Sequence, residues 1–325
     1  MYPQKLNKGD IVRVISPARS LGIISQELRD NAKARFEELG LVLTFGVHVE
    51  EKDDFNSSTI VSRVEDLHNA FSDKSVIAVI TVIGGFNSNQ LLDYIDWDLI
   101  RNNPKILCGY SDITALNNSF FAKTGLVTYS GPHYSTFGQK LYLDYTTDYF
   151  KKCLMNSESF EVIPSKDWSD DEWWRNQDGR NLLKNDGFWI LNEGNAKGTL
   201  LGGNLCTFNL LQGTQYMPDL TNSVLFIEDD SESQPHHFDR NLQSIIHQPG
   251  FDGVRGIVFG RFQKESNMTV DLLRQIVKSK RQLEHIPVIG NADFGHSDPK
   301  ISFPVGGQVS LSVNEKETKL IILEH

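Results

Sequence analysis

The chain has 325 residues, of which 39% are hydrophobic and 23% are charged, and its formal net charge is −10. This length suggests about two domains, and the composition is that of a globular protein with enough apolar residues for a sizeable core. The acidic balance argues against nucleic-acid binding, which needs a basic face, although a local basic pocket for a small anion stays compatible with it.

Short apolar runs alternate with helical patterns over the first 150 residues. The predicted strands are residues 9–18, 41–47, 75–85, 105–110 and 126–132. The predicted helices are residues 25–40, 57–73, 87–96 and 111–123, the second of them capped by a serine. Such alternation is typical of a mostly parallel sheet with helices on both faces. We therefore predict an α/β fold class, with an N-terminal doubly wound domain over residues 1–160.

The pattern changes near residue 160. Residues 161–195 are predicted to be a linker and a tryptophan-rich loop, which contains Trp168, Trp173 and Trp174. Residues 196–325 carry several β-rich runs and only two clear helical patterns, near 236–247 and 269–280. We expect a smaller β-rich C-terminal domain there, a mixed sheet or a partial barrel.

The cysteines and the apolar segments bear on the compartment. Cys108, Cys153 and Cys206 have neither CxxC nor zinc spacing, so we expect buried thiols in a reducing environment. No segment approaches the roughly 20 apolar residues that span a bilayer, and residues 1–18 lack the apolar core of a signal peptide. These features predict a cytoplasmic protein without membrane contact.

The stretch "ILCGYSDITAL" (106–116) places a serine and an aspartate where a predicted strand gives way to a helix. Either Ser111 or Asp112 caps the helix, or Ser111 is a nucleophile at a strand-to-helix turn. A nucleophile needs backbone N–H donors for the oxyanion of acyl transfer. The N–H of Asp112 is one candidate, and another could come from Gly84 or Gly85 at the end of the preceding strand. The stretch is not GxSxG, so the common hydrolase elbow is absent.

A serine nucleophile needs a base and an acid that orients the base. His296 in "NADFGHSDPKISFP" follows a predicted strand, and Glu228 ends the apolar run of "SVLFIEDD". Eight other histidines compete with His296 for the role of base.

A metal cluster is the alternative use of the histidines. Its ligands would be His236, His237, Asp239 and His247. The adjacent histidine pair would not share one face of a helix, so we expect no metal and no cofactor.

Four motifs in order, "CGYSDITAL", "AKGTLLGGNLCTFNLLQGT", "VLFIEDD" and "DFGHSDPKISFPVGG", together resemble the LD-carboxypeptidase family of serine peptidases, which includes the microcin C self-immunity peptidases. The resemblance implies a Ser-Glu-His triad of Ser111, Glu228 and His296. It also implies an oxyanion hole of the Gly85 and Asp112 backbone N–H groups. The family's site lies between an α/β domain and a β-rich domain, and its members often form homodimers, so a homodimer is expected.

Two features bear on the substrate. Muropeptide-cleaving members typically have an Arg-Gly-Gly-Tyr-Gly-like stretch where this chain has "VIGGFNSN", and the form here resembles the microcin-immunity branch. In that branch a loop aromatic stacks on a nucleobase, and Trp173 or Trp174 would do so here, unless both only pack the loop onto the domain. The resemblance thus implies hydrolysis of a peptidyl or aminoacyl nucleotide, with no nucleic-acid partner. The alternatives are a muropeptide LD-carboxypeptidase that releases terminal D-alanine in cell-wall recycling, and a non-catalytic nucleotide-binding module with an anion site at the Gly84–Gly85 turn.

Overall fold

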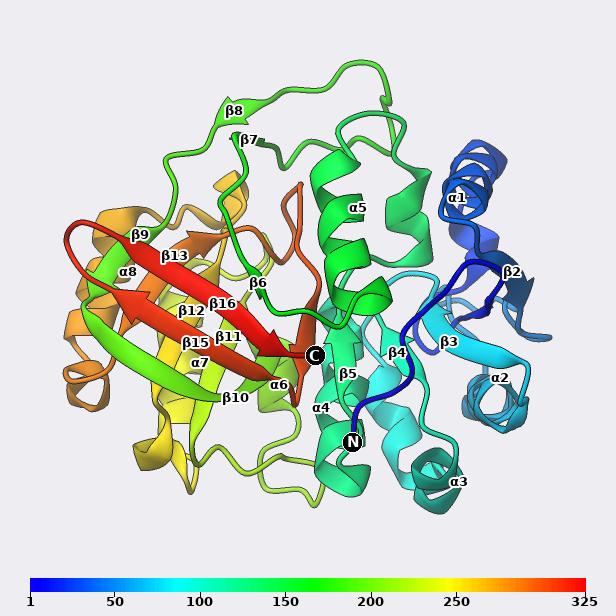
Figure 1. The fold of residues 1–325 in the computed structure, drawn as a ribbon, viewed down its shortest axis with the longest axis horizontal. Coiled ribbons are helices and arrows are strands. Elements are labelled where there is room, and N and C mark those ends of the chain that lie inside the picture. The colour runs from blue at the N-terminus through cyan, green and yellow to red at the C-terminus, as the bar shows by residue number, and fades with distance from the viewer.

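The computed structural model, which describes residues 1–325, contains two large sheets that lie next to each other (Figure 1). The first sheet has five parallel strands from the N-terminal half and one antiparallel strand, β14, from the C-terminal half. Its order is β14 (Phe303–Val305), β5 (Thr128–Ser130), β4 (Ile106–Cys108), β3 (Val76–Thr81), β1 (Ile11–Ile15) and β2 (Val42–Phe45). The fold class is therefore the predicted mostly parallel α/β arrangement.

Helices surround the first sheet. They are α1 (Gln26–Glu38), α2 (Ile60–Ser72), α3 (Trp97–Asn102), α4 (Thr114–Thr124) and α5 (Asp144–Phe150). The side chain of Thr59 caps α2, so the cap is a threonine and not the predicted serine. The predicted helix over 87–96 is a 3-10 turn, η2 (Ser88–Tyr94).

The second sheet has eight strands and is mixed. Its four central strands, β10 to β13, run parallel, and antiparallel strands flank them on both sides. Its order is β6 (Phe160–Glu161), β16 (Thr318–Glu324), β15 (Gln308–Val313), β10 (Gly194–Asn204), β11 (Ser223–Glu228), β12 (Gly256–Gly260), β13 (Val288–Ala292) and β9 (Trp189–Asn192). The helices of this half are α6 (Leu205–Asn209), α7 (Pro235–Ile246) and α8 (Val270–Lys278).

The two sheets are joined through α4 and β10. The Asn118 amide on α4 donates to Gly202 O at 2.8 Å and accepts from Gly202 N at 3.1 Å. Gly203 has a φ of +131°, and a Cβ there would lie 2.4 Å from Thr114 Oγ1, so only glycine permits this close approach. The buried apolar side chains of both halves form one continuous core. The ends of the parallel strands of the two sheets are thereby held in fixed relation.

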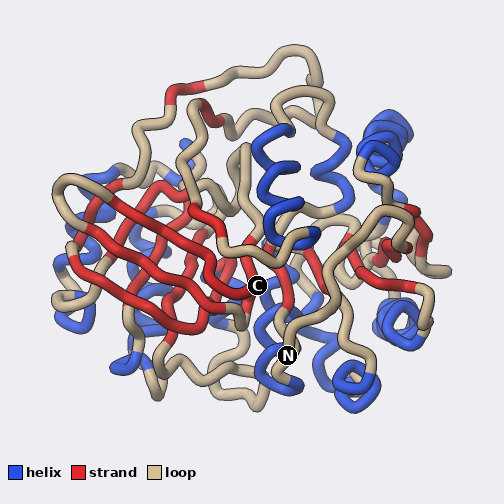
Figure 2. The backbone as a smooth tube through the Cα atoms, in the orientation of Figure 1, coloured by secondary structure: helices blue, strands red, loops and turns tan.

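The segment 161–195 contributes more regular structure than predicted. β6 and β9 at its two ends belong to the second sheet, and β7 (Asp167–Trp168) pairs with β8 (Leu183–Lys184). Figure 2 shows the remainder as a long loop that arches over the top of the molecule in this view. The structure therefore contains the predicted long loop, and the short strands β6 to β9 lie within and beside it.

The thiols differ in exposure. Cys108 and Cys153 are buried as predicted, whereas Cys206 on α6 is exposed, so the expectation for that residue was wrong. None of the helices combines the length and the apolar character that crossing a bilayer requires.

Candidate active site

Ser111, Glu228 and His296 come together at the carboxyl ends of parallel strands. Ser111 follows β4 of the first sheet, Glu228 ends β11, and His296 follows β13 of the second sheet. His296 Nε2 lies 2.9 Å from Ser111 Oγ, and His296 Nδ1 lies 2.8 Å from Glu228 Oε2. A chain of hydrogen bonds thus joins a hydroxyl, an imidazole and a carboxylate, the arrangement in which a serine can lose its proton to a base.

The backbone of Ser111 is in an unusual conformation. Its φ is +60°, a left-handed value that is uncommon for a residue other than glycine and that occurs often at functional sites. No side chain caps the 3-10 turn η3 (Ser111–Ile113) or the helix α4 that follows. The Asp112 carboxylate instead accepts from the backbone N–H groups of Asn87 and Ser88, at 3.0 and 2.9 Å. Helix capping therefore does not account for the serine and the aspartate at this turn.

The two amides predicted as oxyanion donors are free of acceptors. Neither Gly85 N–H nor Asp112 N–H donates to an acceptor in the protein. The turn after β3 passes close to the serine, because a Cβ on Gly84 would lie 3.0 Å from Ser111 Oγ. Free amides beside a serine hydroxyl are the requirement for stabilising a developing oxyanion.

The electrostatics of His296 depend on Glu228. The Glu228 side chain is only 3% exposed, and that of His296 is 19% exposed. Burial lowers the pKa of His296, but the charge of Glu228 and its hydrogen bond raise it more, so the pKa lies above the ordinary value. An imidazole in this position can accept a proton from Ser111 and hold it against the carboxylate.

Two cavities meet at the serine. The larger, of about 470 Å³, is lined by Ser111 and His296 and also by Arg19, Trp173 and Trp174. The smaller, of about 280 Å³, shares Ser111 and Gly85 with it but does not contain His296. A substrate can therefore extend in two directions from the serine.

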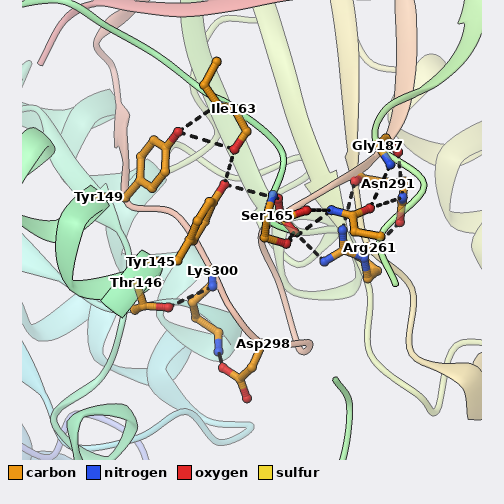
Figure 3. Close-up of polar contacts among 12 residues, drawn as sticks. Tyr145, Thr146, Tyr149, Ile163, Ser165, Gly187, Arg261, Asn291, Asp298 and Lys300 are labelled. Atoms are coloured by element: carbon orange, nitrogen blue, oxygen red, sulfur yellow. Dashed lines mark hydrogen bonds and ion pairs between the residues drawn. The ribbon is translucent and has the colours of Figure 1, made fainter. Parts of the chain in front are cut away.

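A buried network fixes the segment that carries the tryptophans. The Asp293 carboxylate accepts from Ser165 N at 2.7 Å, from Ser165 Oγ at 2.8 Å and from Tyr145 OH at 3.2 Å. It also forms a buried ion pair with Arg261 at 2.5 Å. Figure 3 shows Ser165 between Tyr145 and Arg261.

The loop beyond Ser165 is held in turn by the backbone that follows His296. The main chains of Ser169 and Asp298 exchange two hydrogen bonds, of 2.7 and 2.8 Å. The position of Trp173 and Trp174 at the cavity thus depends on both halves of the chain. Trp168 instead lies against Arg261, whose guanidinium is 5.2 Å from the centre of its ring.

Two residues at the larger cavity were not found from the sequence. Arg19 has no ion-pair partner, and its guanidinium carbon lies 5.3 Å from the centre of the Phe86 ring. His133 is buried, and its Nε2 has no partner. Arg19 follows β1 and His133 follows β5, so inspection of every parallel strand end would have identified both.

The alternative metal cluster is not assembled. Lys280 pairs with Asp239 at 2.5 Å, and His247 Nε2 lies 2.9 Å from Gln243 on its own helix. His236 and His237 lie side by side, with ring centres 4.2 Å apart. The structure contains no group of three or more His, Cys, Asp or Glu side chains that could hold a metal ion.

Comparison with known proteins covers both halves of the chain. Residues 12–131 match the LD-carboxypeptidase N-terminal domain, and residues 197–311 match the LD-carboxypeptidase C-terminal domain. YocD of Bacillus subtilis is 50% identical over the whole of both chains.

Solved structures agree with this match. A crystal structure of an MccF-like protein from Bacillus anthracis is 51% identical and superposes over the whole of both chains with a TM-score of 0.99. The structure of MccF in complex with glutamyl sulfamoyl guanosine is 27% identical, with a TM-score of 0.88 over 99% of this chain and 98% of that chain. The hydrogen-bonded serine, histidine and glutamate thus lie in a chain that belongs to the LD-carboxypeptidase family and has the fold of its MccF-like members.

Proposed function

We propose that this chain is a serine peptidase or amidase that cleaves an amide-type bond through an acyl-enzyme. The observation that carries the proposal is the hydrogen-bonded chain from Ser111 through His296 to Glu228, at 2.9 and 2.8 Å. Ser111 is the nucleophile, His296 the general base and Glu228 the acid that orients it. The free N–H groups of Gly85 and Asp112 form the oxyanion hole.

The steps follow from this geometry. Ser111 Oγ attacks the substrate carbonyl while its proton passes to His296 Nε2, and the oxyanion is held by the two amides. Collapse of the tetrahedral intermediate breaks the C–N bond, and His296 returns the proton to the leaving nitrogen. Water, deprotonated by His296, then attacks the ester and releases the acid and the serine. Glu228 stabilises the imidazolium that exists between these transfers.

The preferred substrate is an aminoacyl or peptidyl nucleotide. Trp173 and Trp174 line the larger cavity, and an aromatic ring that stacks on a base contributes roughly 1 to 3 kcal/mol. The unpaired guanidinium of Arg19 at the same cavity suits the phosphate or sulfamate that follows the scissile bond. MccF, which shares the fold, has been solved with glutamyl sulfamoyl guanosine.

A muropeptide is the second candidate, and Arg19 at the larger cavity is compatible with it. The Arg19 guanidinium would pair as well with the carboxylate of a terminal D-alanine as with a phosphate. The family name itself denotes LD-carboxypeptidases. A non-catalytic nucleotide-binding module is less well supported, because anion binding at the Gly84–Gly85 turn does not require a histidine hydrogen-bonded to both Ser111 and a buried Glu228.

A paired assay tests these proposals. The purified protein is incubated with an aminoacyl sulfamoyl adenosine and with a muropeptide tetrapeptide, and the Ser111→Ala variant is the control. We expect hydrolysis of the first compound, faster than that of the second, and no hydrolysis by the variant. Faster release of D-alanine would favour the muropeptide alternative, and turnover of neither would contradict the peptidase. We also expect a cytoplasmic homodimer, and sedimentation equilibrium would measure its mass.

A further inference from the structure

The turn between β3 and η2 carries Gly85 and has few amide contacts of its own. The backbone N–H groups of residues 83–86 donate to no acceptor in the protein. The next two amides, those of Asn87 and Ser88, both donate to Asp112 Oδ2, at 3.0 and 2.9 Å. The direction of the Gly85 N–H therefore depends on the side chains that hold the far end of this turn.

Asp112 takes part in both halves of the proposed oxyanion hole. Its backbone N–H is one of the two donors, and its side chain holds the turn that carries the other. The residue is only 2% exposed, and Ser88 Oγ donates to its backbone O at 2.7 Å. Because Asp112 directly follows Ser111, these contacts fix the turn relative to the nucleophile.

Arg63 on α2 holds the same turn from a second direction. The residue is only 3% exposed. Its Nη1 donates to Asn87 O at 3.0 Å, and its Nη2 donates to Gln90 Oε1 at 2.9 Å. The peptide group between Asn87 and Ser88 thus has its C=O bound by the guanidinium and its N–H bound by the Asp112 carboxylate.

The guanidinium also fixes the segment beside the turn. Arg63 Nη1 donates to Pro17 O at 3.1 Å, and Pro17 lies just after β1. Two residues further on, Arg19 N donates to Gly84 O at 3.4 Å. One side chain therefore contacts both the turn and the segment that supports it.

The two side chains carry opposite charges and bind the turn through neutral groups. Burial raises the pKa of Asp112 and lowers that of Arg63, and the charge of each residue partly offsets the shift of the other. Loss of either charge would leave the other buried with less compensation. We therefore expect the two residues to act as a unit.

We propose that Arg63 and Asp112 are positioning residues that, through the turn after β3, aim the Gly85 N–H at the oxyanion formed on the substrate of Ser111. The inference rests on the proposed function. Donors that are held in place lower the barrier only where the oxyanion develops. Loss of this positioning should therefore lower kcat and leave KM nearly unchanged.

Kinetics of Arg63→Met and Asp112→Ala test the proposal on whichever substrate the wild type hydrolyses. Removal of one oxyanion donor costs about a hundredfold to a thousandfold in kcat, and here the donor is displaced and not removed. We therefore expect kcat to fall by about tenfold to a hundredfold in each variant, with KM within about threefold of the wild type. The double variant should lose little more than the worse single variant, because both residues hold one turn.

Conservative variants separate positioning from a general loss of stability. Asp112→Asn keeps an oxygen for the two amides, and Arg63→Lys keeps the charge but cannot reach all three acceptors, so each should recover part of the lost kcat. Arg13→Met is the matched control. Arg13 lies in the same sheet, where it pairs with Asp73 at 3.1 Å and donates to Thr44 Oγ1 at 2.7 Å, far along β1 from the turn. Its loss should leave kcat unchanged.

Hydrogen exchange over residues 82–90 tests the contacts without turnover. Exchange should be faster in Arg63→Met and Asp112→Ala than in the wild type and in Arg13→Met. Unchanged exchange, a wild-type kcat in both variants, or an equal loss of kcat in Arg13→Met would overturn the positioning role. Faster exchange in the two variants, with no hydrolysis by the wild type, would support the contacts that hold the turn and contradict the peptidase.

Discussion

Replacement of Glu228 by glutamine isolates the charge that the structure places behind His296. The two side chains have the same shape, but the amide is neutral, and it can also present its –NH₂ group to Nδ1 and favour the wrong tautomer. Two opposite charges about 4 Å apart, at an effective dielectric constant of about 20, attract by about 4 kcal/mol. If most of this attraction stabilises the imidazolium in the transition state, kcat should fall by about a thousandfold.

The pH profile gives a second measure of the same change. His296 must be neutral to accept the proton of Ser111, so activity in the wild type falls as the pH drops through its raised pKa. In Glu228→Gln the negative charge that raises the pKa of His296 is gone, while burial still lowers that pKa. The acidic limb of the kcat/KM profile should therefore move to lower pH. The assay is kcat/KM against pH for the wild type, Glu228→Gln and the exposed control Glu315→Gln. An acidic limb that stays in place, with a loss under tenfold, would refute the role given to Glu228.

Further predictions concern the residues around the site. Trp173→Ala or Trp174→Ala should lower kcat/KM on a nucleotide substrate by an amount equivalent to roughly 1 to 3 kcal/mol, mainly by raising KM. Hydrolysis of a substrate without a base should be almost unaffected. Equal losses of kcat/KM on both substrates would mean that the tryptophans only hold the loop in place. Gly295→Ala should lower kcat by about tenfold or more, because φ of Gly295 is +101° and the new Cβ would lie 2.6 Å from Glu228 Oε2, the carboxylate that orients His296. Gly213→Ala is the matched control, since φ is +74° and no atom lies within 4 Å, and equal kinetic losses in both would contradict the steric explanation. Asp293→Ala removes one partner of a buried ion pair and should lower the free energy of unfolding by about 3 to 5 kcal/mol, and a loss under 1 kcal/mol in urea denaturation would contradict the anchoring role.

Much of the first half of the fold was predictable from local patterns. The run 75–85 is apolar except for Ser75 and Thr81 because β3 is covered on both faces of the sheet, and the structure places a strand at Val76–Thr81. The helix predicted over residues 25–40 is α1, which spans Gln26–Glu38 and is capped by Ser25. The cap of α2 was assigned to a serine because several hydroxyl residues stand together there, and Thr59 has the role instead.

Other features depend on tertiary contacts that no local pattern contains. Ser111 and His296 are 185 residues apart and meet only because α4 packs on β10 between the two sheets, so the pairing came from the family motifs. Asp112 stands where a helix cap is expected, yet its carboxylate binds the turn at Asn87, which the sequence does not indicate. Cys206 was expected to be buried because its neighbours are apolar, but on α6 it lies on the side that borders the smaller cavity.

The central claim is that Ser111 is an activated nucleophile, and covalent labelling tests it most directly. The wild-type protein is treated with a fluorophosphonate probe, and the modified residue is identified by mass spectrometry of its peptides. Ser111 should be labelled stoichiometrically, with no labelling of Ser111→Ala and much slower labelling of His296→Ala. Absence of label in the folded wild type, or equal labelling of wild type and Ser111→Ala, would contradict the account.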